Sequence, residues 1–345
     1  MKAAFTPALV RKAERWAILT VALMVGISVV ATLWISGSSL VENIRRIPMH
    51  AVWVLVAATV VQNLLRFARY YIAAQAMHLH VPWYRHLYYF VVGFAMIPTP
   101  GKIGMAIRLW LLRQYHGLPY SRTAPLMVMD LVSDAIAMLA LVSLSLLVLH
   151  DSRLHTLGVL AVTGLVMGTL LALVAPGILR RVLKITYGLS GKRKPRLFAR
   201  LLGMVRTLSQ VFGLRIMGAT IGLSFVAWGL YGVAVAYLIQ GFGITSFGMA
   251  QGNLAMNLSN IGGFLSMMPA GIGGAEVSLG GVFNLFDVPM GVVVLAVVII
   301  RLVDVWLPVL VGFLLLPIAI RNAPKANLKS ARVIPLKIVT TTTVE

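Results

Sequence analysis

The stretch Pro269-Ala270-Gly271-Ile272-Gly273-Gly274-Ala275-Glu276 interrupts a hydrophobic segment that would otherwise form a continuous membrane helix. Proline lacks a backbone N–H, and the glycines that follow it weaken a helix further. Within lipid, a broken helix is tolerated only where protein or a water-filled cavity satisfies the freed backbone groups. The stretch therefore predicts a buried polar cavity. The structural breaks are expected at Pro269, Gly271, Gly273 and Gly274.

A second stretch with the same pattern lies in the first half of the chain, Pro98-Thr99-Pro100-Gly101-Lys102-Ile103-Gly104. When Pro100 is aligned with Pro269, Gly104 falls opposite Gly273. Two interrupted segments in corresponding positions of two halves point to the binding site of a transporter built from inverted repeats. The alternative is one continuous bundle in which both segments are kinked, full-length helices. The breaks expected in this first segment are Pro98, Pro100, Gly101 and Gly104.

The composition indicates a membrane protein. Of the 345 residues, 59% are hydrophobic and 11% are charged, whereas a soluble domain carries roughly 25% charged residues. The chain has no cysteine, which excludes disulfides and thiolate metal sites. His78 and His80 are two residues apart, the wrong spacing for one helix face, and no carboxylate accompanies them. We therefore expect no metal and no cofactor.

The hydrophobic pattern predicts an all-α polytopic membrane protein with about six full spans and two opposed, re-entrant broken hairpins. The spans are expected at 16–35, 51–77, 122–149, 157–178, 216–239 and 289–320, and the hairpins at 83–113 and 247–287. All belong to a single membrane transport domain, 1–322, with repeat A at about 14–150 and repeat B at about 155–320. A cytoplasmic tail, 323–345, follows.

The basic residues set the expected orientation. Thirty Lys and Arg stand against nine Asp and Glu, a net charge of +21. Segment 180–215 carries ten Lys or Arg and no acid, and such clusters stay on the cytoplasmic side of a membrane. The segment predicts either a basic amphipathic helix in the interface or a solvated linker helix. Both termini are then cytoplasmic, and no nucleic-acid partner is expected because no basic, aromatic-bearing domain is present.

Charged residues at membrane depth are the candidate site, because each costs at least a few kcal/mol unless it pairs or faces water. They are the acids Asp130, Asp134, Glu276 and Asp304 and the bases Arg66, Arg69, Lys102, Arg108 and Arg301. Lys102 and Arg108, beside the helix N-termini of the first break, predict a phosphate site. The alternative for Arg108 is a salt bridge to Asp130 or Asp134.

The other charges each have two interpretations. Glu276 either titrates a proton or binds a lipid amine, or it complements the dipole of the helix it opens and pairs with Arg301. Asp304 shares a helix face with Arg301, where the two neutralise each other or take part in a proton relay. Arg66 and Arg69 also share a face. The favoured interpretation is that they reach phosphates of the inner leaflet, and the other is that they draw anionic headgroups inward.

A row of asparagines precedes the second break at positions 253, 257 and 260, on one helical face. These side chains line the cavity or join neighbouring helices. The substrate-binding set is therefore Lys102, Arg108, Arg301, Glu276, Asn257 and Asn260. The coupling or gating set is Asp130, Asp134 and Asp304.

The two breaks resemble the two motifs of the flippase-like membrane domain. Residues that match the first motif are Pro100, Gly101, Gly104, Arg108, Gly117 and Asp134, and residues that match the second are 269–273, Glu276 and Arg301. That domain is the transmembrane region of bacterial lysylphosphatidylglycerol synthetases and also stands alone as an inner-membrane family. The resemblance covers roughly residues 10–320 and implies lipid translocation across the bacterial cytoplasmic (inner) membrane. Asp130 departs from the pattern, since it stands near a position where the family often has arginine.

These features predict a lipid flippase, not an enzyme, that moves an anionic or lipid-linked headgroup between leaflets. The soluble aminoacyl-transfer domain is absent, so the resemblance does not imply lipid synthesis. Candidate substrates are a phospholipid, an aminoacyl-phospholipid, a polyprenyl phosphate or a glycolipid. No Gly-x4-Gly-Lys-Ser/Thr pattern indicates coupling to ATP. The alternatives are a small-anion carrier, a membrane enzyme acting on lipid-linked substrates, and a structural partner of a lipid-biosynthesis enzyme.

Overall fold

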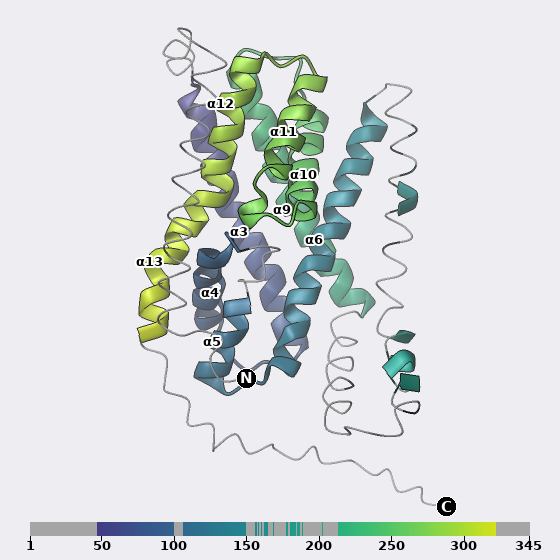
Figure 1. The fold of residues 1–345 in the computed structure, drawn as a ribbon, viewed down its shortest axis with the longest axis vertical. Coiled ribbons are helices and arrows are strands. Elements are labelled where there is room, and N and C mark those ends of the chain that lie inside the picture. Colours follow the sequence, from purple (N-terminus) through teal and green to yellow (C-terminus); the bar gives the residue numbers. More distant parts are fainter. Residues whose placement is uncertain are drawn as a thin grey trace, which may run out of the picture.

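The computed structural model describes residues 47–99, 106–149 and 213–321, together with scattered helical positions between 156 and 202. The expected first span at 16–35, most of the span at 157–178 and of the basic segment at 180–215, and the tail at 323–345 lie outside the described residues. Every described element is a helix, and the long helices run nearly parallel to one bundle axis (Figure 1).

Four described helical stretches are long and apolar enough to cross a membrane. They are α3 (Met49–Ala76), α6 (Tyr120–Val148), α9 (Leu214–Gly241) and the stretch Met290–Arg321. A helix of 28 residues extends about 42 Å, more than the ~30 Å of a hydrocarbon core. Each stretch begins and ends within two residues of an expected span, so four of the six predicted spans are confirmed as helices.

Proline marks where several of these helices begin. Pro48, Pro82, Pro119 and Pro289 each occupy the position just before the first helical residue. The first N–H groups of a helix have no intrahelical partner, so the missing N–H of proline costs little there. The last stretch is composite: α12 (Met290–Arg301), a π-helical segment η5 (Leu302–Trp306) and α13 (Leu307–Arg321).

The second predicted break is present as an interruption between two helices, and of the first only the non-helical residues Pro98 and Thr99 are described. The first segment comprises α4 (Trp83–Val92), the 3-10 helix η2 (Gly93–Met96) and α5 (Ile107–His116). The second comprises α10 (Met249–Leu265), η4 (Pro269–Gly271) and α11 (Gly274–Leu285). Figure 1 shows the first segment in one half of the bundle and the second in the other half.

Glycine allows α10 and α11 to lie against each other. A Cβ atom added to Gly274 would stand 2.3 Å from the carbonyl oxygen of Gly262. One added to Gly271 would stand 2.9 Å from the Cα atom of Gly263. Ser259 reinforces the contact by donating its hydroxyl to the carbonyl of Ala275 at 2.9 Å. The chain therefore folds back on itself at the second break.

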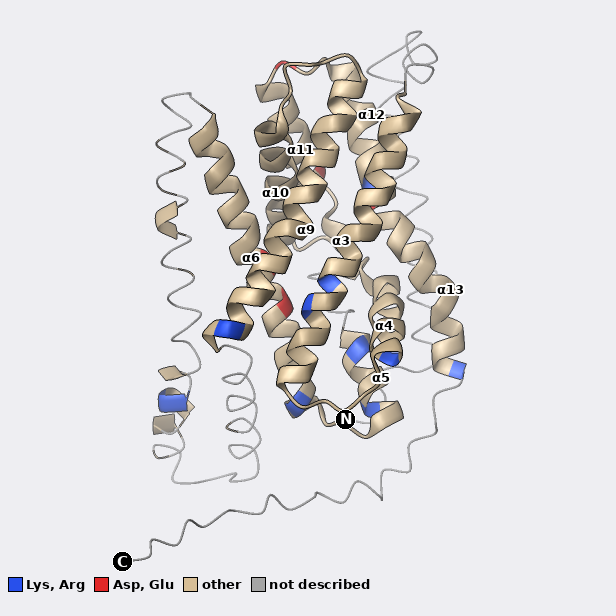
Figure 2. Cartoon of the chain, turned by 180° about the vertical axis from the view of Figure 1, so that it is seen from behind, with Lys and Arg blue, Asp and Glu red and all other residues tan. Residues whose placement is uncertain are grey.

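The apolar core has two main clusters that follow this division. One joins the first half of α3 to α9, α10, α11 and α12, and the other joins the second half of α3 to α4, α5 and α13. Figure 2 shows that the Lys and Arg residues of the described helices lie mostly in the half that contains α4 and α5. Charged side chains from both halves meet between the two clusters, and these form the candidate site.

Candidate functional site

Arg69 is the centre of a buried charge cluster between α3 and α6. Its side chain is 1% exposed, and it lies between two carboxylates one helical turn apart. Arg69 Nη2 donates to Asp130 Oδ1 at 2.9 Å, and Arg69 Nη1 donates to Asp134 Oδ1. The acids are four residues apart and so share a face of α6, which lets one guanidinium bind both.

Trp228 on α9 holds the other side of this cluster. Its indole Nε1 donates to Asp134 Oδ1 at 2.9 Å, which satisfies a donor that would otherwise be buried unpaired. The guanidinium of Arg66 lies over the Trp228 ring, 5.1 Å from its centroid. Arg66 Nη2 reaches Asp134 Oδ2 at 3.5 Å. Arg66 is therefore held more loosely than Arg69, by a long contact and a ring face.

Arg108 joins the cluster from α5. Its side chain is 3% exposed, and its Nη1 lies 3.5 Å from Asp130 Oδ2. The guanidinium packs on the Phe90 ring, 4.1 Å from the centroid. A Cβ atom on Gly93 would stand 2.3 Å from Arg108 Nε, so glycine is needed to admit this side chain. The interpretation of Arg108 as a salt-bridge residue that ties the first broken segment to α6 is confirmed.

We call the set Arg66, Arg69, Arg108, Asp130 and Asp134 the α6 cluster. The prediction that Arg66 and Arg69 reach the phosphates of the inner leaflet is wrong, because both side chains turn inward to Asp134. The sequence separation of 65 residues hides this pairing. The four-residue spacing of Asp130 and Asp134 places both acids on one helix face, and this was the sequence feature that indicated a shared basic partner.

A second cluster surrounds the break between α10 and α11. Arg301 Nε pairs with Glu276 Oε1 at 2.8 Å, and Arg301 Nη2 donates to the carbonyl oxygen of Ala270. Glu276 Oε2 accepts the backbone N–H of Gly273 at 2.7 Å. We call Ala270, Gly273, Glu276 and Arg301 the tip cluster. Both structural interpretations of Glu276 hold here. It accepts a backbone N–H at the N-terminus of α11, and it pairs with Arg301.

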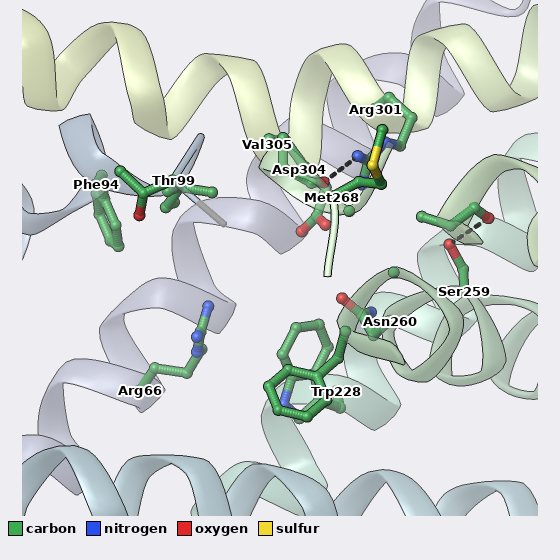
Figure 3. A pocket seen from close by; sticks show the side chains of 16 residues that line it. Arg66, Phe94, Thr99, Trp228, Ser259, Asn260, Met268, Arg301, Asp304 and Val305 are labelled. Carbon is green, nitrogen blue, oxygen red and sulfur yellow. Dashed lines mark hydrogen bonds between the residues drawn. The ribbon is translucent and has the colours of Figure 1, made fainter. Parts of the chain in front are cut away.

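Asp304 lies in the π-helical segment one turn beyond Arg301. An extra residue in a helical turn re-aims the side chains that follow it, and such segments occur often at functional sites. In Figure 3, the Asp304 carboxylate and the Arg301 guanidinium lie on the same side of a cavity. The two residues therefore face the same side, as expected, although Asp304 lies in a π-helical turn and not in a regular α-helix.

The cavity lies between the two clusters. Its volume is about 60 Å³, room for several water molecules. Figure 3 shows Arg66 on one side, Arg301 and Asp304 across from it, and Trp228 and Asn260 between them. The lining also includes Thr99 of the first interrupted stretch, and Ala270 and Gly271 of the second. Both broken segments therefore contribute to one cavity, as the sequence predicted.

Of the expected site residues, Arg301, Asp304 and Asn260 line the cavity. Arg108, Asp130, Asp134, Glu276 and Asn257 are not among the lining residues, and Lys102, Pro100, Gly101 and Gly104 lie outside the described residues. Trp228 was not assigned to the site from the sequence, and Arg66 was counted among the charges at membrane depth but not in the substrate-binding set. Within the described ranges, no group of three or more His, Asp and Glu side chains is placed to hold a metal ion.

Four helical stretches long enough to cross a membrane and a charged internal cavity indicate a membrane protein with an internal polar site. The chain belongs to the family of the lysylphosphatidylglycerol synthase transmembrane region, whose model matches residues 20–312. This confirms the resemblance stated from the two motifs and connects the chain with membrane phospholipid handling. A search of curated proteins finds no match.

Proposed function

We propose that this chain moves a phosphate-bearing lipid headgroup between the leaflets of the bacterial cytoplasmic membrane. The observation that carries the proposal is the cavity between the two broken segments, which Arg66 and Arg301 line from opposite sides. Arginines at membrane depth are costly and mark substrate or ion pathways. A guanidinium binds phosphate through two parallel N–H groups, so two facing arginines suit a phosphate headgroup.

The charge balance on the Arg66 side of the cavity supports an anionic ligand there, whereas on the other side Glu276 and Asp304 outnumber Arg301. Among the described residues, the α6 cluster links three arginines to two aspartates, which leaves one positive charge in excess. Arg66 is the member that lines the cavity, and its contact with Asp134, at 3.5 Å, is looser than those of Arg69. A phosphate at Arg66 would balance the cluster without breaking the closer pairing of Arg69. The candidate lipids remain a phospholipid, an aminoacyl-phospholipid, a polyprenyl phosphate or a glycolipid.

The proposed mechanism is alternating access in an inverted repeat. The two broken segments act as hairpins that enter the membrane from opposite sides, and both termini are cytoplasmic. The acids Asp130, Asp134 and Asp304 exchange protons or swap salt bridges as access changes. The headgroup passes through the cavity while the acyl chains stay in lipid, and no bond of the substrate is broken, so the chain is not an enzyme.

A small-anion carrier is the second candidate, and the cavity volume favours it. A space of about 60 Å³ accepts a few waters or a small anion more readily than a whole headgroup. Under this alternative, an inorganic anion crosses without a lipid.

The test is leaflet exchange of labelled lipids in proteoliposomes, beside uptake of radioactive phosphate into the same vesicles. We expect wild type to exchange phosphate-bearing lipids faster than empty vesicles, and Arg66→Gln to lose most of that rate. Arg113→Gln is the matched control, because Arg113 is exposed and also lies over an aromatic ring, 4.7 Å from the Tyr120 centroid. Phosphate uptake without lipid exchange would replace the flippase by the small-anion carrier.

A further inference from the structure

The tip of the second broken segment, residues 266–273, has an unusual backbone. Within it, Met267 and Ala270 have φ angles of +53° and +56°, and Gly271 and Gly273 are also positive. Left-handed backbone is unfavourable for residues with a Cβ atom and persists only where neighbouring contacts enforce it. Something must therefore hold this tip in place.

Arg301 is the side chain that holds it. The Nη2 group donates to the carbonyl of Ala270, the residue in the left-handed conformation. Through Nε it pairs with Glu276, whose other oxygen accepts the N–H of Gly273. One guanidinium therefore fixes both ends of the turn from 270 to 273. Arg301 itself lies on a different element, α12, so the contact can be lost without breaking a helix.

Two of the residues in this contact, Arg301 and Ala270, also line the cavity. Gly271 lines it as well, so a ligand in the cavity meets the guanidinium and the tip together. A phosphate is a stronger hydrogen-bond acceptor for a guanidinium than a neutral carbonyl is. A ligand shifts such an equilibrium only through its different affinity for the two states, and the phosphate gains most when Arg301 has left Ala270.

We propose that Arg301 is an anion-sensitive latch on the tip: phosphate in the cavity takes Arg301 from the Ala270 carbonyl, and the strained tip then relaxes. This inference rests on the proposed function, since it assigns the release step to the same cavity. It makes Arg301 a positioning residue for the gate as well as a ligand for the substrate. The tip is the moving part, and the α6 cluster is the fixed wall opposite.

The test is hydrogen exchange of tip amides, measured by mass spectrometry on the full chain in phosphatidylcholine nanodiscs. Gly271, Ile272 and Gly273 report directly, because their N–H groups are bonded within the turn or to Glu276. Arg301→Lys keeps the charge but loses the planar fork. We expect it to raise tip exchange about tenfold, by loss of charge-assisted hydrogen bonds. Inorganic phosphate should raise hydrogen exchange of the wild-type tip amides several-fold, and chloride at equal ionic strength should not. The control Arg113→Lys should match wild type in both salts.

A second variant covers the case in which Arg301→Lys does not fold. Ala270→Gly keeps the carbonyl but removes the cost of the left-handed conformation, so tip exchange should slow and respond less to phosphate. The latch would be overturned if tip amides of Arg301→Lys exchanged at the wild-type rate. It would also be overturned if phosphate did not change tip exchange in wild type. Wild-type leaflet exchange is measured in parallel. Lipid movement without a phosphate response rejects the latch alone, and a phosphate response without lipid movement supports the latch while rejecting the flippase.

Discussion

The two charge clusters hold their broken segments in different ways. In the α6 cluster, side chains bind side chains: Arg108 of the first segment meets Asp130 on a full-length helix, and Arg69 completes the pairing. In the tip cluster, Arg301 and Glu276 bind the backbone of the break itself, at Ala270 and Gly273. The first arrangement fixes a helix against a neighbour, whereas the second fixes a turn that can change shape without moving a helix.

Exposure follows the same difference. Arg69 of the α6 cluster is 1% exposed and its two acids are 12% and 16% exposed, while in the tip cluster Arg301 is 9% and Glu276 23% exposed. A buried ion pair is hard to break because each charge left behind lacks water. A partly exposed pair can trade its partner for solvent or ligand. We therefore expect the α6 cluster to be the fixed wall of the cavity and the tip cluster to be the adjustable one.

The largest expected effect breaks the fixed wall. Arg69→Met leaves two buried aspartates without their shared cation, and removing one partner of a buried pair typically costs about 3–5 kcal/mol. We expect a loss of unfolding free energy in that range, measured by denaturant titration in detergent micelles. Adding Asp130→Asn and Asp134→Asn to the same chain should increase the loss, because Arg66 and Arg108 would then lack their carboxylate partners. A loss below about 1 kcal/mol, typical of surface pairs, would contradict a static α6 cluster.

The sequence allowed the breaks to be predicted but only part of the pairing. Proline and glycine act on their own backbone, so the interruptions at Pro269 and Gly271 follow from local chemistry. The pairs of Arg301 with Glu276 and of Arg108 with Asp130 were among the interpretations considered. The contact of Arg69 with Asp134 joins distant segments through tertiary packing, which local spacing does not encode. The π-helical turn at Asp304 likewise depends on how the last helix packs, and no residue type signals it.

A smaller effect concerns the packing that lets the tip exist. Gly274→Ala places a Cβ atom 2.3 Å from the carbonyl oxygen of Gly262, and overpacking of this kind typically costs about 1–3 kcal/mol. The measurement is the same denaturant titration. Gly281→Ala is the matched control on the same helix, because nothing lies within 4 Å of its added Cβ. That control should be neutral or slightly stabilising, by up to about 1 kcal/mol. Equal behaviour of the two variants would show that α10 and α11 do not approach as closely as described.

The smallest effect on stability should come from the cavity surface that joins the two halves. The Asn260 amide donates only to the carbonyl of Met256 in its own helix, at 3.0 Å. Asn260→Ala removes this local bond and leaves the helix intact, so we expect a change within about 0.5 kcal/mol. Its rate of lipid exchange should nevertheless fall, because the side chain lies between Arg66 and Arg301 in the lining. If the cavity binds headgroups, Asn260→Ala lowers the rate of lipid exchange without changing stability. If the cavity is purely structural, the substitution changes neither quantity. Unfolding and leaflet exchange of the same preparation decide between them.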